Sequence, residues 1–303
     1  MSIERKPIVI LGPTASGKSD SAMSAAMSNG NTEIVVCDAM QVYKRMDIGT
    51  AKPTLEDQQK VQHHCIDLVD PSARFTVSDY QIAARAAVAD IHTREKNALV
   101  VAGTGLYLTS LIDDLSFPGE WPEIRRELQE EPDVNTLYRR LKALDPVAAA
   151  NIERSNRRRI ERALEVCMGS GKPFSDNAPG TGAYPDNGVV QIGLLWPREV
   201  LVKRVAERVN AMLKWGFLDE VRDLRKSGNM SITAKQALGY AELLRHLEGK
   251  CTLEQAVGDI VIHTRQFAVR QERWFRRDPR ITWVNIEKNP VAEIGAVLAK
   301  HLN

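Results

Sequence analysis

An eight-residue stretch near the start of the sequence has the residue types and spacing of a phosphate-binding loop. Residues 12–19 are GPTASGKS, which fits the pattern GxxxxGKS/T in full. Two glycines let successive backbone N–H groups turn toward a phosphate, and the helix that follows would point its positive end at the same anion. We expect Lys18 to contact the outer phosphate and the Ser19 hydroxyl to bind Mg²⁺. The stretch predicts a di- or triphosphate site formed by Gly12, Pro13, Thr14, Ala15, Ser16, Gly17, Lys18 and Ser19.

A second candidate for chemistry is Asp38, which directly follows a short apolar run at 33–37. An aspartate at the carboxyl end of a parallel strand lies where ligands bind in open α/β sheets. We expect this strand to lie next to the phosphate-loop strand, so that Asp38 binds Mg²⁺ through water or acts as a general base. The alternative is a structural aspartate that caps a turn or a helix. The apolar run at 99–102 ends in Gly-Thr-Gly and lacks the Walker-B acid of hydrolytic P-loop enzymes.

Arginines gather at 157–162 and at 265–280, where six arginines stand against two acidic residues and surround Trp274 and Phe275. This mixture suits RNA, because guanidinium groups contact phosphates while aromatic rings stack on bases. The use of Arg instead of Lys favours planar, bidentate or stacked recognition. A solvated helix face is the alternative, and on charge alone it is the more common one.

The composition is that of an ordinary globular protein. Lys and Arg total 41 against 39 for Asp and Glu, and the net charge of +2 argues against a histone-like basic binder. No apolar run is long enough for a membrane span or a signal peptide, and four separated cysteines indicate reduced thiols in the cytoplasm. His63-His64-Cys65 is rich in metal ligands, but nothing nearby completes a zinc site. The second GxGK, at 169–172, is expected to be a loop or a helix end.

The elements that would position these residues alternate between strand and helix. Short apolar runs at 7–11, 33–37 and 99–102 are separated by helical patterns, which predicts a parallel sheet covered on both faces. The pattern at 122–172 is helical and charged, a Gly/Pro-rich connection follows it, and another buried strand is expected at 189–196.

A strand that returns after a helical block indicates an insertion into the sheet domain. We predict a discontinuous α/β core domain at 1–116 and 186–303, interrupted by an all-helical insertion domain at 117–185. The rest of the core domain is expected to be mainly helical, with a long helix at 253–275 and a last edge strand at 281–284.

Several motifs together resemble the bacterial tRNA dimethylallyltransferases. Besides GPTASGKS they are DAMQVY at 38–43, MDIGTAKP at 46–53, HCID at 64–67, AGTGLY at 102–107, RALEV at 162–166, LGY at 238–240 and RQ at 270–271. They stand in the family's order and cover nearly the whole chain. The stretch 46–53 is far more specific than the P-loop, because ordinary P-loop NTPases have nothing similar.

The resemblance implies a P-loop NTPase-like fold that catalyses prenyl transfer. It also implies a cytoplasmic protein that is expected to be a monomer. A dimethylallyl group would pass from dimethylallyl diphosphate to N6 of the adenosine at position 37 of tRNA, next to the anticodon. The P-loop, Lys18 and Mg²⁺ would stabilise the diphosphate leaving group, and Asp38 matches the family's general base. Thr104 matches a threonine at the reacting region, and Arg208 matches an arginine that holds the diphosphate.

The resemblance also implies contacts with the anticodon stem-loop of tRNA. The matching positions are Asp38, Ala39, Met40, Gln41, Thr104, Arg125, Arg158, Arg159, Ile160, Glu161, Arg162, Gln236, Ala237, Leu238, Gly239, Tyr240, Arg270, Gln271, Arg273, Trp274 and Arg276. The segment 38–41 would surround a flipped-out adenine, since N6 must reach a buried allylic carbon. Val269 and Arg273 depart from the Lys and Thr that the family commonly has at these positions.

Two other functions stay open on the residues alone. A P-loop kinase of nucleotides or small metabolites would transfer phosphate from ATP, and it would leave the motifs at 38–53 unexplained. An RNA-binding NTPase would use the arginine clusters without transferring an alkyl group.

Overall fold

The computed structural model describes residues 5–177 and 182–302. The chain divides into two compact units, the first made of Met1–Asp114 with Tyr184–Asn303 and the second of Leu115–Ala183. The second unit is thus inserted into the first, and its bounds differ by two residues at each end from the predicted insertion at 117–185.

The first unit is built on a six-stranded sheet in which every neighbouring pair of strands is parallel. The strands are β1 Ile8–Leu11, β2 Thr32–Cys37, β3 His63–His64, β4 Asn97–Ala102, β5 Val190–Leu195 and β6 Ile281–Asn285. Their order across the sheet is β3-β2-β4-β1-β5-β6. The predicted α/β class is confirmed, and β6 is the edge strand expected at 281–284.

Helices of this unit cover both faces of the sheet. The helices in the described part of this unit are α1 Lys18–Asn29, α2 Leu55–Lys60, α3 Val77–Thr93, α4 Gly105–Ile112, α9 Arg198–Lys214, α10 Phe217–Lys226, α11 Ile232–Lys235, α12 Tyr240–Leu247, α13 Leu253–Phe275 and α14 Pro290–Leu302. Ile8 and Ile10 of β1 pack into one core with α1, α9 and α14. Val9 and Leu11 face the opposite core, which α3 and α4 cover. Because both faces are buried, the strands are continuous apolar runs in the sequence.

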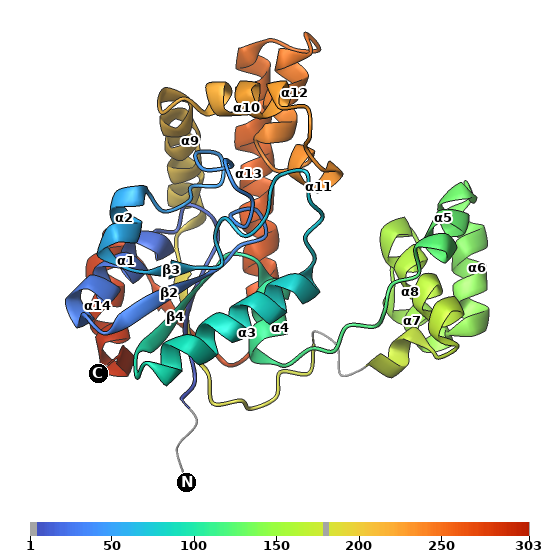
Figure 1. The fold of residues 1–303 in the computed structure, drawn as a ribbon, viewed down its shortest axis with the longest axis horizontal. Helices are drawn as coiled ribbons and strands as arrows, with labels where there is room; N and C mark the ends of the chain where they lie inside the picture. The colour runs from blue at the N-terminus through green and yellow to red at the C-terminus, as the bar shows by residue number, and fades with distance from the viewer. Residues whose placement is uncertain (1–4, 178–181, 303) are drawn as a thin grey trace. The chain divides into compact units, whose positions relative to one another are not determined.

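A third hydrophobic core lies among α9, α10, α12 and α13 (Figure 1). Phe217 and Tyr240 meet edge to face there, with ring centroids 5.0 Å apart. Val42, Tyr43 and Met46, from the loop after β2, are buried in the same core. The segment that follows Asp38 is therefore packed against a helical bundle. None of the helices in the described part of the chain has both the length and the apolar character needed to span a bilayer.

The second unit consists of helices with a core of their own. They are α5 Pro122–Glu130, α6 Val134–Leu144, α7 Pro146–Asn151 and α8 Arg157–Ser170, followed by a 3₁₀ turn at Phe174–Asn177. Side chains such as Leu128, Leu141 and Ile160 are fully buried among them. The starts of α6, α7 and α8 are capped by side chains at Asp133, Asp145 and Asn156, as expected for these residue types.

The structure corrects one expectation about the sheet. β4 lies between β1 and β2, so the strand that ends at Asp38 is not next to the phosphate-loop strand. Chain order does not fix the order in the sheet, because a helical crossover can skip a position. β3 was not predicted, since two residues carry no periodic signal.

The second GxGK is a helix end, as predicted. Gly171 follows the last residue of α8 in the left-handed conformation, with φ of 70°. Part of the predicted Gly/Pro-rich connection, residues 178–181, lies outside the described residues.

Candidate active site

The predicted phosphate loop joins the end of β1 to the start of α1. Gly17 precedes the helix with φ of 87°, a left-handed conformation that glycine adopts without steric cost. No side chain caps α1. The N–H groups of its first turn, at Lys18 and Ser19, therefore have no acceptor from the helix itself. This is the arrangement that binds anions at the start of a helix.

Two side chains from the C-terminal half of the chain hold the loop from outside. Trp196 Nε1 donates to the Ser16 carbonyl at 2.8 Å, and Arg204 Nε donates to the Ala15 carbonyl at 2.7 Å. The Arg204 guanidinium also lies over the Trp196 ring, 4.6 Å from its centroid. Neither residue was predicted, although Arg204 precedes Arg208 by four positions and so shares its face of α9.

Lys18 lies in a desolvated, positively charged space. Its Nζ donates to the Pro13 carbonyl at 3.3 Å. Burial and then the charge of Arg208 lower the pKa of Lys18 to about 8, while Asp38 acts in the opposite direction. Burial also lowers the pKa of Arg208, and Asp38 again opposes the shift. Asp20 also opposes both shifts. An anionic ligand would offset the cost of burying these two cations close together.

The ends of β1, β2 and β4 meet around Gly103. A Cβ atom on this glycine would lie 3.4 Å from Asp38 Oδ2, 3.4 Å from Gln271 Nε2 and 3.5 Å from Lys18 Cε. The predicted general base and the predicted phosphate-binding lysine thus flank one point. A side chain at position 103 would occupy the space between them.

The two carboxylate oxygens of Asp38 have different surroundings. Oδ1 accepts hydrogen bonds from the N–H groups of Met40, at 2.8 Å, and Gln41, at 3.3 Å. Thr104 Oγ1 accepts from the Ala39 N–H at 3.2 Å, so the turns after β2 and β4 are joined. One oxygen of Asp38 thus fills the turn-capping role that was the alternative interpretation. The other oxygen, Oδ2, faces the space at Gly103.

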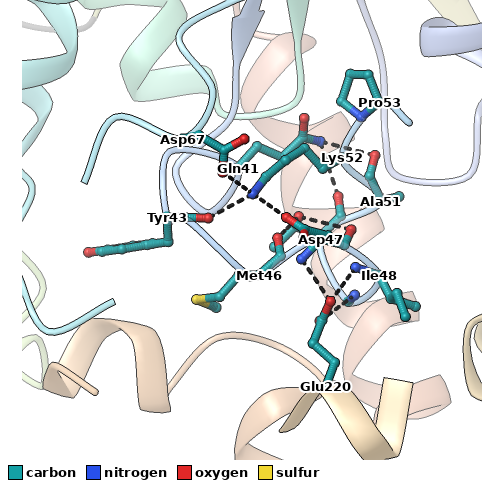
Figure 2. A network of polar contacts seen from close by, with 12 residues as sticks. Gln41, Tyr43, Met46, Asp47, Ile48, Ala51, Lys52, Pro53, Asp67 and Glu220 are labelled. Carbon is teal, nitrogen blue, oxygen red and sulfur yellow. Dashed lines mark hydrogen bonds and ion pairs between the residues drawn. The ribbon is translucent and has the colours of Figure 1, made fainter. Parts of the chain in front are cut away.

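The MDIGTAKP motif forms a loop around the ammonium group of Lys52, whose side chain is 2% exposed (Figure 2). Its three acceptors, at 2.8, 2.5 and 2.6 Å, are Tyr43 O, Asp47 Oδ1 and Asp67 Oδ1. Gln41 belongs to the same network, because its Nε2 donates to the carbonyls of Thr50 and Ala51. The network therefore holds the segment that begins at Asp38.

Glu220 on α10 anchors this loop from a second side (Figure 2). Its carboxylate accepts the Tyr240 hydroxyl at 2.6 Å and three successive N–H groups at 2.9, 2.7 and 3.2 Å, those of Asp47, Ile48 and Gly49. Position 49 requires glycine, because a Cβ there would lie 2.2 Å from the Phe217 ring. Lys52 and Glu220 were not predicted as site residues. The only sequence signal for Lys52 was the unusual motif at 46–53, and Glu220 had no such signal.

On α13 the predicted RNA-contact positions separate into exposed and buried groups. Arg270, Arg273 and Arg276 are exposed, whereas Gln271 is 7% exposed and bonded inside the protein. Trp274 is half-buried against Gly105, where a Cβ would lie 2.1 Å from its ring. Arg280, counted in the sequence cluster, pairs with Asp113 and Asp278. It serves the fold.

At 236–240 the exposed member is Gln236, and Leu238 is half-buried. The side chains of Ala237 and Tyr240 are buried in the third core. Gly239 has φ of 87°, and a Cβ on it would lie 2.7 Å from the Phe217 ring, so a larger residue is excluded. Ala237 and Tyr240 therefore support this turn, and a direct RNA contact stays a prediction for its exposed members.

In the second unit, Arg158 and Arg159 are exposed, and neither side chain has an ion pair or hydrogen bond with any residue that the structure describes. Ile160 is buried in the core, and Glu161 pairs with Arg157 at 2.6 Å. Arg125 and Arg162 both pair with the buried carboxylate of Glu165, at 2.9 and 3.0 Å. Ile160 thus has a packing role, and these two arginines have a structural role that the sequence did not reveal.

The ligand-rich spot at 63–65 is used for structure. His63 Nδ1 bonds the Val61 carbonyl and His64 Nε2 bonds Glu33, while burial raises the pKa of Cys65 to about 12. Within residues 5–177 and 182–302 no three His, Cys, Asp or Glu side chains are grouped so that they could hold a metal ion.

Comparison with known proteins gives a consistent result. The family model described as IPP transferase matches residues 41–278. A tRNA dimethylallyltransferase of Thermobifida fusca is 45% identical over 286 residues, covering 91% of this chain and 89% of the relative. A tRNA dimethylallyltransferase of Geobacter metallireducens is 43% identical over 284 residues, covering 91% of each.

Solved structures agree. The tRNA isopentenylpyrophosphate transferase of Bacillus halodurans superposes with a TM-score of 0.71 at 36% identity, covering 99% of this chain and 97% of that one. A eukaryotic dimethylallyltransferase acting on tRNA gives a TM-score of 0.77 at 28% identity, covering 93% of this chain and 74% of that one. These neighbours share the P-loop NTPase-like fold, and the relatives are prenyltransferase enzymes. The chain therefore belongs to the IPP transferase family.

Proposed function

We propose that this protein transfers a dimethylallyl group from dimethylallyl diphosphate to N6 of the adenosine at position 37 of tRNA. The observation that carries the proposal is the convergence of Lys18, Asp38 and the Thr104 turn around Gly103 in a member of this family. A phosphate loop that faces a carboxylate across a small open space suits a reaction in which a diphosphate leaves as a proton is removed.

The proposed reaction is a displacement in which the diphosphate is the leaving group and Asp38 is the proton acceptor. The N6 amine attacks C1 of the dimethylallyl group, and the bond between C1 and the diphosphate oxygen breaks with its electrons on the diphosphate. The N6 proton passes to Asp38 Oδ2, the oxygen that faces the shared space. Lys18, Arg208 and the amides at the start of α1 stabilise the charge on the leaving group.

Mg²⁺ fits this site as a partner of the diphosphate. Because the described residues hold no preformed acidic cluster, the ion would be held by diphosphate oxygens, water and the Ser19 hydroxyl at the start of α1. Its ligand preference for oxygen matches this set. When bound, Mg²⁺ neutralises charge on the leaving group.

The tRNA would be bound by exposed positive charge in both units. The proposed contacts with the anticodon stem-loop are Arg270 and Arg273 on α13, Arg276 directly after this helix, and Arg158 and Arg159 on α8. The segment 38–41 surrounds the flipped adenine, since it carries the base Asp38 and is fixed by the Gln41 contacts. We further propose that the protein acts as a monomer in the cytoplasm.

One assay tests the reaction. Purified protein is incubated with Mg²⁺, labelled dimethylallyl diphosphate and a tRNA transcript with adenosine at position 37, and label in the RNA is counted. A transcript with guanosine at position 37 is the matched control. Label in the adenosine transcript alone is the expected result, whereas ATP turnover without label transfer would contradict the proposal.

Asp38→Asn tests the general base. It keeps the hydrogen bonds of Oδ1 to the turn but cannot accept the N6 proton, so kcat should fall by about 10²- to 10⁴-fold while tRNA affinity changes little. An Asp38→Asn variant with most of its activity would remove Asp38 from the mechanism.

A further inference from the structure

Gln271 is a buried amide that joins three parts of the site. It lies on α13 next to the exposed Arg270, and Gln271 itself is 7% exposed. Its Oε1 accepts the Thr14 N–H of the phosphate loop at 2.8 Å, and its Nε2 donates to the Gly103 carbonyl at 2.6 Å. One side chain thus connects the phosphate loop with the turn that carries Thr104.

These contacts are unlike those of an RNA-binding residue. Both polar atoms of the amide are already used inside the protein, and Nε2 points to the same space as Asp38 Oδ2 and Lys18 Cε. An amide is suited to this place, because it donates in one direction and accepts in the other. A glutamate could keep the contact with Thr14, but it would lose the donor to Gly103 and add negative charge beside the diphosphate.

We propose that Gln271 is a positioning residue that sets the separation between the diphosphate cradle and the base side of the site. Thr14 belongs to the loop that holds the leaving group, and Gly103 lies beside Asp38. A displacement in which N6, C1 and the leaving oxygen must align depends steeply on that separation. The inference rests on the proposed role of the P-loop as a diphosphate site, and it replaces the predicted tRNA contact at this position.

The test measures binding without turnover. Pyrophosphate with Mg²⁺ is titrated by calorimetry into wild-type protein and the variants Gln271→Met and Gln271→Glu, and tRNA affinity is measured in parallel. Losing two hydrogen bonds in Gln271→Met should weaken pyrophosphate about tenfold, and the added charge of Gln271→Glu should weaken it by about 100-fold. The tRNA Kd should stay within about twofold in both variants.

Arg270→Ala is the matched control, because Arg270 is the exposed neighbour of Gln271 on the same helix. It should weaken tRNA and leave pyrophosphate affinity unchanged. In Gln271→Glu, lowering the pH should also restore pyrophosphate affinity relative to wild type, because a protonated carboxyl can again donate to the Gly103 carbonyl.

Three results would overturn the inference. A Gln271→Met protein with weakened tRNA binding and normal pyrophosphate binding would make the residue an RNA contact. A lower Tm with both Kd values unchanged would make its role purely structural. If the loss of pyrophosphate affinity in Gln271→Glu did not respond to pH, neither the added charge nor the lost donor to Gly103 could be its cause. Wild-type protein that binds no pyrophosphate would instead contradict the proposed function itself.

Discussion

Lys52 Nζ lies 2.6 Å from the carboxylate of Asp67, which is 15 residues further along the chain (Figure 2). The backbone of Asp67 in turn donates its N–H to the Gln41 carbonyl at 3.1 Å. Asp67 therefore links the buried ammonium group of Lys52 to the segment 38–41 through one ion pair and one hydrogen bond. This relationship gives the MDIGTAKP motif a physical role, which is to fix the backbone that carries the base.

Lys52→Met should destabilise the protein and lower its activity. The two carboxylates are 58% and 40% exposed and can be hydrated, so we expect a smaller loss of stability than for a fully buried pair, about 2 kcal/mol. Urea unfolding measures the stability, and kcat for prenyl transfer should fall more than affinity for pyrophosphate. Lys60→Met, which removes an exposed pair with Glu56, should leave the free energy of unfolding close to that of the wild type. Equal effects of the two substitutions would show that the network is dispensable.

Diphosphate binding should weaken as pH rises through about 8, the pKa of Lys18 in the free protein. A bound anion favours the protonated lysine, so affinity is full below this pH and declines above it. Between pH 7 and 9 the charged fraction falls about tenfold, and pyrophosphate affinity should fall similarly. The ratio of wild-type to Lys18→Met affinity at each pH corrects for titration of pyrophosphate. A constant ratio would exclude Lys18 as the titrating group.

Glu33 should contribute stability that disappears in acid. Its side chain is 4% exposed, and hydrogen bonds from Arg94 above all, then from Lys96 and His64, hold the pKa of this carboxyl far below its usual range. A depressed folded-state pKa stabilises above the unfolded value near 4.3 and loses its effect as pH falls toward the folded value. Glu33→Gln should therefore cost about 3 kcal/mol at pH 7 in urea unfolding. The difference in unfolding free energy between the variant and the wild type should become smaller below about pH 4. A difference that does not depend on pH would argue against an ionised Glu33.

Arg158 and Arg159 should contribute to tRNA affinity through phosphate contacts. Replacing both with alanine should weaken tRNA binding and reduce the slope of log K against log salt by about 1 to 2, without changing pyrophosphate affinity. Filter binding from about 50 to 300 mM salt measures the slope. Arg126→Ala removes an exposed arginine that is already paired with Glu123 in the same unit. This variant should change the salt slope less than the double variant does. An unchanged slope in the double variant would identify the pair as a solvated helix face.

The elements with a strong local signal could be predicted from the sequence. The apolar runs became β1, β2, β4 and β5, because strands buried on both faces must be continuously hydrophobic. The helix predicted at 253–275 is α13 with the same bounds. The position of β4 between β1 and β2 could not be predicted, since the crossover that sets it leaves no local pattern.

The site shows the same division. Lys18 and Asp38 are marked by their motifs, but their approach around Gly103 depends on how three strand ends meet. The resemblance predicts RNA contacts at Arg125 and Gln271, but charge and motif position say nothing about burial or partners inside the protein. In the structure, one pairs with the buried Glu165 and the other bridges the phosphate loop to the turn after β4. Partners distant in sequence decide whether a polar side chain contacts a ligand or supports the fold.

The position of β1 in the sheet has a consequence for the order in which the sheet can assemble during synthesis. β1 pairs on one side with β4 and on the other with β5, whose residues follow the whole inserted unit. A nascent chain that has emerged up to β4 therefore presents β1 as an open edge, and it stays open until residues 190–195 leave the ribosome. The phosphate loop accepts hydrogen bonds from Trp196 and Arg204. We therefore expect the loop to reach its final conformation only after these residues have been synthesised.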